Sequence, residues 1–201
     1  MKIICIGKNY VNHAKEMGSE IPKEPLFFLK PDSAILPKKH PFFIPDFSRE
    51  IHYELELLIK IKKLGKHIGK KFASSYYSEI GLGIDFTARD LQNECKINGH
   101  PWEKAKAFDH SAVIGSAFYS INNLNEIHFE LKKNGNLVQQ GNANDMFFNF
   151  DDIIHHVSKF MTLKIGDIIF TGTPEGVGPV KIGDYLEGFL NGNKIIDLNI
   201  K

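Results

Sequence analysis

Apolar residues in this chain gather in short runs, which are separated by clusters of glycine, proline and asparagine. Short apolar runs bounded by turn-forming residues are typical of β-strands. These runs predict strands at residues 2–6, 25–29, 54–61, 80–86, 127–133, 167–172 and 194–200. Asn-Gly pairs at Asn134-Gly135 and Asn191-Gly192 lie between β-like runs and predict hairpin turns. We therefore expect a β-rich fold.

Helical patterns are fewer than strand patterns. The segment from Thr87 to Ile97 is predicted to be a helix, with Thr87 as its N-cap and Asp90 three residues further on. Apolar residues recur at helical spacing between Asp151 and Met161, and a shorter helix is expected at residues 9–17. The predicted class is thus β-rich α+β, with a few short helices.

Composition limits the class of protein further. A chain of 201 residues with 42% hydrophobic and 24% charged residues suits one globular domain. No repeat, low-complexity tract or linker is visible, so residues 1–201 are expected to form that single domain. Lys and Arg number 25 against 24 Asp and Glu, which leaves no basic field for nucleic acid or an anionic membrane. Any anionic ligand must be held by local groups.

Cysteine content and hydropathy indicate the compartment. Cys5 and Cys95 are the only cysteines, too few for a disulfide framework or a cysteine-rich zinc site, and consistent with a reducing environment. The first residues lack a cleavage pattern, and no stretch approaches the ~20 apolar residues of a membrane span. The sequence therefore predicts a cytoplasmic protein.

Two glutamates share one face of the predicted strand at 54–61. Glu54 and Glu56 are two residues apart, about 7 Å in a strand, and in a half-buried setting they would repel by roughly 2 kcal/mol. Either both face water, the usual outcome for such a pair, or a cation compensates them. Asp85 ends another apolar strand and supplies a third carboxylate. Three carboxylates can bind Mg²⁺ or Mn²⁺ and leave positions for water or a chelating substrate.

Three further stretches offer candidate chemistry. His13 and Glu16 are spaced i, i+3 on a predicted helix, as in a base dyad that activates water, although a solvated surface pair has the same spacing. The glycine-rich stretch at 171–180 can bring backbone N–H groups close to a carboxylate, and it lacks the Walker A lysine of nucleotide-binding loops. Lys104 and Lys106 are two residues apart, and most such lysines lie on the surface. The alternative is that one of them enters a metal site, where its positive charge could neutralise an enolate or carboxylate.

Five stretches in this order resemble the fumarylacetoacetate hydrolase superfamily, in its short single-domain acylpyruvase and oxaloacetate decarboxylase branch. They read "GKNYVNHAKE", "PLFFLKP", "HYELELLIKI", "GLGIDFTARDLQNECKINGHPWEKAKAFD" and "GDIIFTGTPEGVGPVKIGD". The resemblance implies a mixed β-roll catalytic domain, a homodimer, and Mg²⁺ or Mn²⁺ as cofactor. Two positions depart from the family pattern: Lys8 stands where arginine is common, and Asn12 where aspartate is common.

The resemblance also assigns roles to individual residues. Metal ligands are implied at Glu54, Glu56 and Asp85. A lysine near the metal matches Lys106 and not Lys104, a substrate-contacting glutamine matches Gln92, and the loop that holds the substrate carboxylate matches Gly172 and Thr173. A His–Glu dyad on a mobile lid matches His13 and Glu16.

The activity implied first is hydrolysis of the C–C bond of acylpyruvates, which are small 2-oxo acids, with oxaloacetate decarboxylation as a second activity. In both reactions the cation stabilises the pyruvate enolate that is left when the bond breaks. One alternative is an isomerase or tautomerase of unsaturated 2-hydroxy dicarboxylates or of oxaloacetate, which needs no activated water. Another is a non-catalytic dimer that binds dicarboxylates, which the gathering of like charges argues against.

Overall fold

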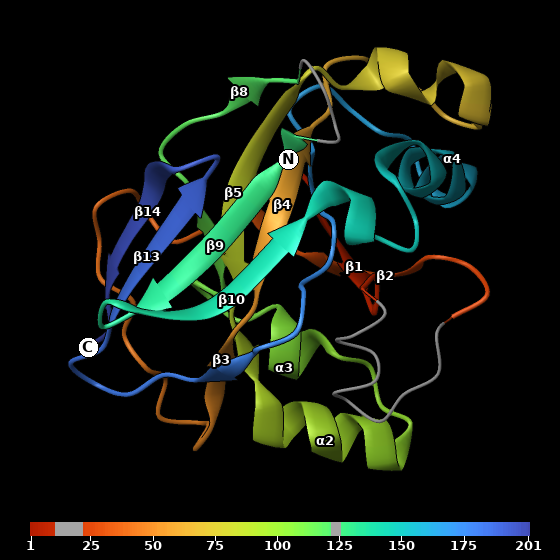
Figure 1. Ribbon diagram of the computed structural model, residues 1–201. Coiled ribbons are helices and arrows are strands. Elements are labelled where there is room, and N and C mark those ends of the chain that lie inside the picture. Colours follow the sequence, from red (N-terminus) through yellow and green to blue (C-terminus); the bar gives the residue numbers. More distant parts are fainter. Residues whose placement is uncertain (11–21, 122–125) are drawn as a thin grey trace.

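The computed structural model describes residues 1–10, 22–121 and 126–201 (Figure 1). The strands are β1 (Ile3–Gly7), β2 (Leu26–Lys30), β3 (Ile51–Tyr53), β4 (Leu55–Lys60), β5 (Glu79–Asp85), β6 (Thr87–Ala88), β7 (Ala112–Ile114), β8 (Tyr119–Ser120), β9 (His128–Lys133), β10 (Asn136–Asn142), β11 (Ile168–Phe170), β12 (Gly178–Pro179), β13 (Tyr185–Leu190) and β14 (Asn193–Asn199). The α-helices are α2 (Arg89–Asn98), α3 (Glu103–Lys106) and α4 (Phe150–Phe160), and short 3-10 turns lie at Asp32–Ala34, Lys70–Tyr76 and Ala143–Asp145. The predicted β-rich class with a few short helices is confirmed.

The largest sheet has seven strands, in the order β2-β1-β11-β4-β5-β7, with β8 paired to β5. Strand β1 runs parallel to β11, and the other pairs are antiparallel, so the sheet is mixed. Because β11 lies between β1 and β4, the chain that leaves β11 at Thr171 runs directly beside the strand that carries Glu56. This order brings the glycine-rich stretch to the acidic one.

A second sheet of four strands, β10-β9-β13-β14, contacts the large sheet through β5 and β4 (Figure 1). Both predicted hairpin turns are confirmed within it. Asn134 and Gly135 have φ of 53° and 80°, and Asn191 and Gly192 have φ of 47° and 77°. Positive φ at both central residues defines the two-residue turn that matches strand twist, which explains the Asn-Gly pairs. A third sheet of three short strands has the order β12-β3-β6.

Strand β4 is buried on both of its faces. Leu55, Leu57 and Ile59 are fully buried in the main core between the two larger sheets, and Leu58 belongs to a smaller apolar cluster on the opposite face. The predicted alternation along this strand is therefore confirmed. The acidic residues share the face of Leu58, so they point away from the main core, although they too are buried.

The helix at the predicted Thr87 N-cap begins later than expected. Thr87 and Ala88 form β6, which pairs with β3, and α2 starts at Arg89. Thr87 does not cap the helix, because the N-cap residue is Ala88 and no side chain caps it, and the Thr87 hydroxyl accepts a hydrogen bond from Lys106, 2.6 Å away. Asp90 Oδ1 in the first turn accepts from Leu91 N and from the hydroxyl of Ser48. The predicted cap at Thr87 is therefore wrong.

The helix predicted at 151–161 is observed as α4, one residue earlier, because the Asn149 side chain caps it by accepting from Asp152 N. The helix predicted at 9–17 falls mostly outside the described residues. Its first two positions are not helical, since Asn9 is irregular and Tyr10 forms a β-bridge with Met146. Within the described part of the chain, no helix combines the length and apolar character needed to cross a membrane.

Candidate active site

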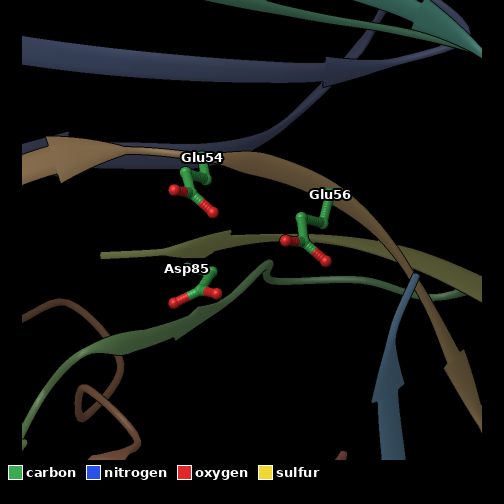
Figure 2. A group of neighbouring side chains, drawn as sticks. All are labelled: Glu54, Glu56 and Asp85. Atoms are coloured by element: carbon green, nitrogen blue, oxygen red, sulfur yellow. The ribbon is translucent and has the colours of Figure 1, made fainter. Parts of the chain in front are cut away.

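Glu54, Glu56 and Asp85 converge on one point (Figure 2). One carboxylate oxygen of each lies within 4.8 Å of the other two, and the residues are 5%, 2% and 1% exposed. Sheet register explains the meeting: Leu55 pairs with Ile84, and Asp85 N donates to Glu54 O across β4 and β5. The expectation of an exposed acidic face is thereby excluded, and the charge repulsion must be compensated inside the protein.

Part of that compensation comes from Lys106, which lies at the end of α3. Its ammonium is 2.8 Å from Glu54 Oε2 and 2.8 Å from Asp85 Oδ2, and it also donates to Thr87 Oγ1. Burial opposes the charged form, but the carboxylates of Asp85 and Glu54 outweigh it and raise the pKa of Lys106. The lysine therefore stays protonated between two of the three acids.

Two other cations complete the network. Arg89 donates to Glu54 Oε1 at 2.6 Å, and Lys30 Nζ lies 2.8 Å from Asp85 Oδ1. Lys30 is 1% exposed and also donates to the hydroxyl of Ser111 and the carbonyl oxygen of Lys106. Glu54 and Asp85 each contact two cationic side chains, so their charges are balanced without any ligand.

Glu56 differs from the other two acids. Its Oε2 accepts from the backbone N–H of Gly172 at 2.7 Å, and no lysine or arginine pairs with it among the described residues. Burial raises the pKa of Glu56 well above its usual range, and the charges of Asp85 and Glu54 raise it further. A divalent cation bound at this point would lower the pKa of Glu56, because a nearby opposite charge favours the ionised carboxylate.

The three residues fit such an ion by the chemistry of their donors. They offer only hard oxygen ligands, which Mg²⁺ and Mn²⁺ prefer. The ammonium of Lys106 already occupies a cationic position between two of them, and Glu56 supplies a carboxylate that still needs a positive partner. A divalent ion held by Glu54, Glu56 and Asp85 is therefore consistent with the structure.

Gln92 and Arg89 lie together on α2. The side-chain carbonyl of Gln92 accepts from Arg89 Nη1 at 2.5 Å, and both residues are buried. Arg89 also donates to Nδ1 of His52 at 3.4 Å, and the other ring nitrogen of His52 lies 2.8 Å from Glu50 Oε1. The guanidinium is thus held from three sides, and the bound carbonyl leaves the NH₂ group of Gln92 as its donor toward a ligand.

The loop after β11 is hydrogen-bonded directly to β4. Thr171 Oγ1 donates to Leu57 O, and Thr173 Oγ1 donates to Leu55 O. Gly172 between them has φ of +99°, and a Cβ there would lie 2.7 Å from the Cβ of Asn9, so only glycine fits. Both threonine hydroxyl protons are used within the protein in this state, and Thr173 Oγ1 also accepts a hydrogen bond from Gln139 Nε2 at 2.9 Å.

The cavity around the acids has polar and apolar sides. The polar lining includes the three carboxylates, Arg89, Gln92, Lys106 and Thr173. The apolar side is formed by Ile6, Phe28 and Trp102, and the rings of Phe28 and Trp102 meet edge-on with centroids 5.8 Å apart. Such a wall excludes water from one side of the cavity and strengthens charge interactions within it.

Most predicted site residues meet in this cavity. Glu54, Glu56, Asp85, Lys106, Gln92 and Thr173 line it, and Gly172 contacts it through its hydrogen bond to Glu56. Lys104 is exposed on α3, as expected for a surface lysine. His13 and Glu16 lie outside the described residues, so the predicted dyad stays a prediction.

Sequence reasoning missed three residues of the network. Arg89 stands four residues after Asp85 and three before Gln92, a spacing that could have placed it beside both. Lys30 ends an apolar run directly before a proline, and nothing local distinguishes it from a surface lysine. Gln139 on β10 donates a hydrogen bond to Thr173, and no local sequence pattern predicts this contact.

Comparison with known proteins identifies the family. The model of the fumarylacetoacetate (FAA) hydrolase C-terminal domain matches residues 2–200. The chain belongs to the fumarylacetoacetate hydrolase family. This confirms the resemblance inferred from the five sequence stretches.

Two relatives carry named activities. The mitochondrial oxaloacetate tautomerase FAHD1 of Bos taurus is 43% identical over 193 residues, covering 94% of this chain and 87% of the relative. The mitochondrial oxaloacetate decarboxylase of Dictyostelium discoideum is 43% identical over 195 residues, covering 95% of this chain and 89% of the relative. Relatives of this chain are therefore enzymes of oxo acids.

Solved structures agree with the fold. A family member from Yersinia pestis CO92 has a TM-score of 0.94 at 40% identity, covering all of this chain and 93% of that one. Fumarylpyruvate hydrolase of Pseudomonas aeruginosa, in complex with Mn²⁺ and pyruvate, has a TM-score of 0.92 at 33% identity, covering 100% and 89%. The 2-hydroxyhepta-2,4-diene-1,7-dioate isomerase of Mycobacterium marinum has a TM-score of 0.86 at 30% identity, covering 99% and 73%.

Proposed function

We propose that this protein is a divalent-metal-dependent enzyme that converts small 2-oxo acids through an enolate, with oxaloacetate as its first candidate substrate. The observation that carries the proposal is the meeting of three buried carboxylates within 4.8 Å, with the ammonium of Lys106 between two of them. The oxaloacetate enzymes that match at 43% identity support the choice of substrate. Sequence reasoning placed acylpyruvate hydrolysis first, and that activity becomes the second candidate.

The protein's own groups have distinct tasks in this proposal. Glu54, Glu56 and Asp85 would hold Mg²⁺ or Mn²⁺, which when bound acts as a Lewis acid toward the carboxylate and 2-oxo oxygens of a chelating acid. Lys106 stays protonated and places its positive charge where the 2-oxo oxygen gains negative charge. The N–H of Gly172 fixes Glu56, and Arg89 fixes Glu54.

Two reactions of oxaloacetate each pass through an enolate, that of pyruvate in decarboxylation and that of oxaloacetate itself in tautomerisation. In decarboxylation the C3–C4 bond breaks, its electron pair forms the enolate of pyruvate, carbon dioxide leaves, and C3 then takes up a proton. In tautomerisation the C3–H bond breaks as a proton leaves C3, another proton joins the 2-oxo oxygen, and no carbon–carbon bond breaks. Fixed positive charge at the oxygen lowers the barrier to both, since charge develops there in each transition state.

Metal dependence is the first test. Purified protein treated exhaustively with a chelator should lose turnover of oxaloacetate, and Mg²⁺ or Mn²⁺ should restore it. Asp85→Asn removes one ligand charge and should lower metal-dependent turnover by at least about 100-fold. Glu187→Gln, at a partly exposed position of strand β13 that does not line the cavity, serves as the control and should leave the rate unchanged. Equal activity after chelation would refute the proposal.

Acylpyruvate hydrolysis is the second candidate, favoured by the likeness to fumarylpyruvate hydrolase. This reaction needs a water molecule activated by a base, the role predicted for His13 with Glu16. His13→Ala should then lower acetylpyruvate hydrolysis by roughly two to four orders of magnitude. Product analysis by NMR separates the reactions, because hydrolysis yields pyruvate and a carboxylic acid, whereas tautomerisation or isomerisation yields one isomeric product.

A further inference from the structure

Two further lysines, Lys8 and Lys96, line the same cavity as the acids but form no ion pair with them. Lys8 follows β1 in the left-handed backbone region, with φ of 58°. Its neighbour Asn9 is fully buried, and the Asn9 amide donates to Thr171 O and Phe148 O, which fixes the backbone at this turn. Lys8 is thereby held at the cavity by a constrained segment.

The second lysine, Lys96, comes from α2. Arg89, Gln92 and Lys96 are spaced i, i+3 and i+7, so they share one face of that helix, and all three line the cavity. Lys96 is exposed, but partial burial of its ammonium and the positive charges of Arg89 and Lys8 lower its pKa, against the opposite effect of Glu54. Three cationic side chains from two elements therefore lie close enough to repel one another.

These cations are not equally compensated. Arg89 pairs with Glu54, but neither Lys8 nor Lys96 forms an ion pair with any acid in the described parts of the chain. Glu54 and Asp85 are thus paired with cations, whereas the positive charges of Lys8 and Lys96 have no acidic ion-pair partner in the described part of the chain. Uncompensated like charges gathered at a cavity favour an anionic ligand.

We propose that Lys8 and Lys96 bind the distal carboxylate of a 2-oxo dicarboxylate whose 2-oxo acid head lies at Glu54, Glu56 and Asp85. The inference rests on the proposed function and makes its substrate class more specific. Phe28 and Trp102 form an apolar wall on one side of the same cavity, which reduces the screening of charge pairs beside that wall, whereas Lys96 itself is exposed. A substrate with a neutral tail would leave both ammonium groups without a partner.

Steady-state kinetics with matched substrates test the inference. Oxaloacetate and acetylpyruvate share the 2-oxo acid head, but only oxaloacetate has a second carboxylate. With Mn²⁺ present, Lys8→Met and Lys96→Met should each raise the KM for oxaloacetate about tenfold, the usual effect of losing one charge-assisted hydrogen bond. The KM for acetylpyruvate should change less than about twofold. Lys104→Met, at an exposed lysine of α3, is the control and should alter neither value.

A variant that keeps the positive charge at residue 96 distinguishes loss of the charge interaction from loss of side-chain packing. Lys96→Arg keeps the positive charge and should restore most of the oxaloacetate KM that Lys96→Met loses. An equal rise in KM for both substrates, or no rise for oxaloacetate, would overturn the inference while leaving the proposed function intact.

If neither substrate is turned over, the proposed function is refuted. A binding measurement then still tests the roles of Lys8 and Lys96. Calorimetric titration of the Mn²⁺-loaded protein would compare oxalate, which has no distal arm, with 2-oxoglutarate, which has one. Lys96→Met should weaken 2-oxoglutarate binding about tenfold and leave oxalate binding unchanged. Equal affinities in wild type and variant for 2-oxoglutarate would overturn the inference.

Discussion

Gln139 shows how a residue outside the recognised motifs sets the geometry of the site. Its side-chain carbonyl accepts from Leu55 N at 2.9 Å, between Glu54 and Glu56. Its amide group donates to Thr173 Oγ1 at 2.9 Å and to Pro174 O at 3.0 Å. One buried amide thus joins the acidic strand to the glycine-rich loop. We infer that it holds the two sides of the cavity at a fixed separation.

Gln139→Leu tests this at the scale of a single residue. The change leaves Leu55 N and Pro174 O without their side-chain partner, which should lower the free energy of unfolding by about 2–6 kcal/mol, at about 1–3 kcal/mol for each of the two buried unsatisfied groups. Denaturant unfolding measures that loss. Gln140→Leu is the matched control, because Gln140 is the exposed neighbour on β10 and should change stability by less than about 0.5 kcal/mol. Similar losses in both variants would contradict the role of Gln139.

At the scale of elements, Asp167 fastens β11 to the start of the chain. Its carboxylate accepts from the backbone N–H of Lys2 and of Lys164, each at 2.8 Å, and from the ammonium of Lys2 at 2.5 Å. Burial would raise the pKa of Asp167, but these hydrogen bonds outweigh it and hold the pKa below the usual 3.8. The contact keeps β1 in register with β11, and hence the loop at Gly172 beside Glu56.

This depressed pKa predicts a pH dependence of stability. A carboxyl whose pKa is lower in the folded state stabilises the fold above its unfolded pKa, and the stabilisation disappears as pH falls through the folded pKa. Asp167→Asn should therefore be less stable than wild type at pH 7, by about 1–3 kcal/mol. The difference should shrink steadily below about pH 4. Urea unfolding of both proteins across this range is the measurement, and a difference independent of pH would contradict the prediction.

At the scale of the whole molecule, the acidic site couples metal binding to stability. Without a cation, the buried carboxyl of Glu56 lies beside two other acids, and its raised pKa reports an unfavourable environment for charge. Any ion that binds the folded chain alone stabilises it by mass action, about 2.7 kcal/mol at a concentration 100 times the dissociation constant. Metal binding therefore requires the negative charge of Glu56, whereas that charge lowers the stability of the metal-free protein.

Glu56→Gln should separate the two demands. The amide can still accept from Gly172 N, and it removes one of the three like charges, so the metal-free variant should be more stable than metal-free wild type by about 0.5–2 kcal/mol. Mn²⁺ should raise the unfolding midpoint of wild type and have little effect on the variant. Thermal unfolding with and without Mn²⁺ measures both effects. An equal shift by Mn²⁺ in both proteins would exclude Glu56 as a ligand.

Several larger expectations stay predictions. The family model spans residues 2–200, which agrees with one domain over residues 1–201 but does not test it. The homodimer, the cytoplasmic location and the dyad of His13 and Glu16 are likewise untested by the described residues.

The sequence by itself determined the features that depend on near neighbours. Strand alternation placed Glu54 and Glu56 on one face, the Asn-Gly pairs identified both hairpins, and ordered motifs identified the family. Strands β10 and β13 escaped notice because glycine and polar residues interrupt their apolar pattern.

Only the tertiary structure decided which distant groups meet the acids. The pairing of Asp85 with Lys30, of Glu54 with Arg89, and of Thr173 with Gln139 joins residues between 34 and 55 positions apart. The same packing turned the predicted cap Thr87 into an acceptor for Lys106. Local propensity carries no information about such contacts, because sheet register and strand order set them. Burial then makes an unpaired charge costly, which favours ion pairs between residues that the fold has brought together.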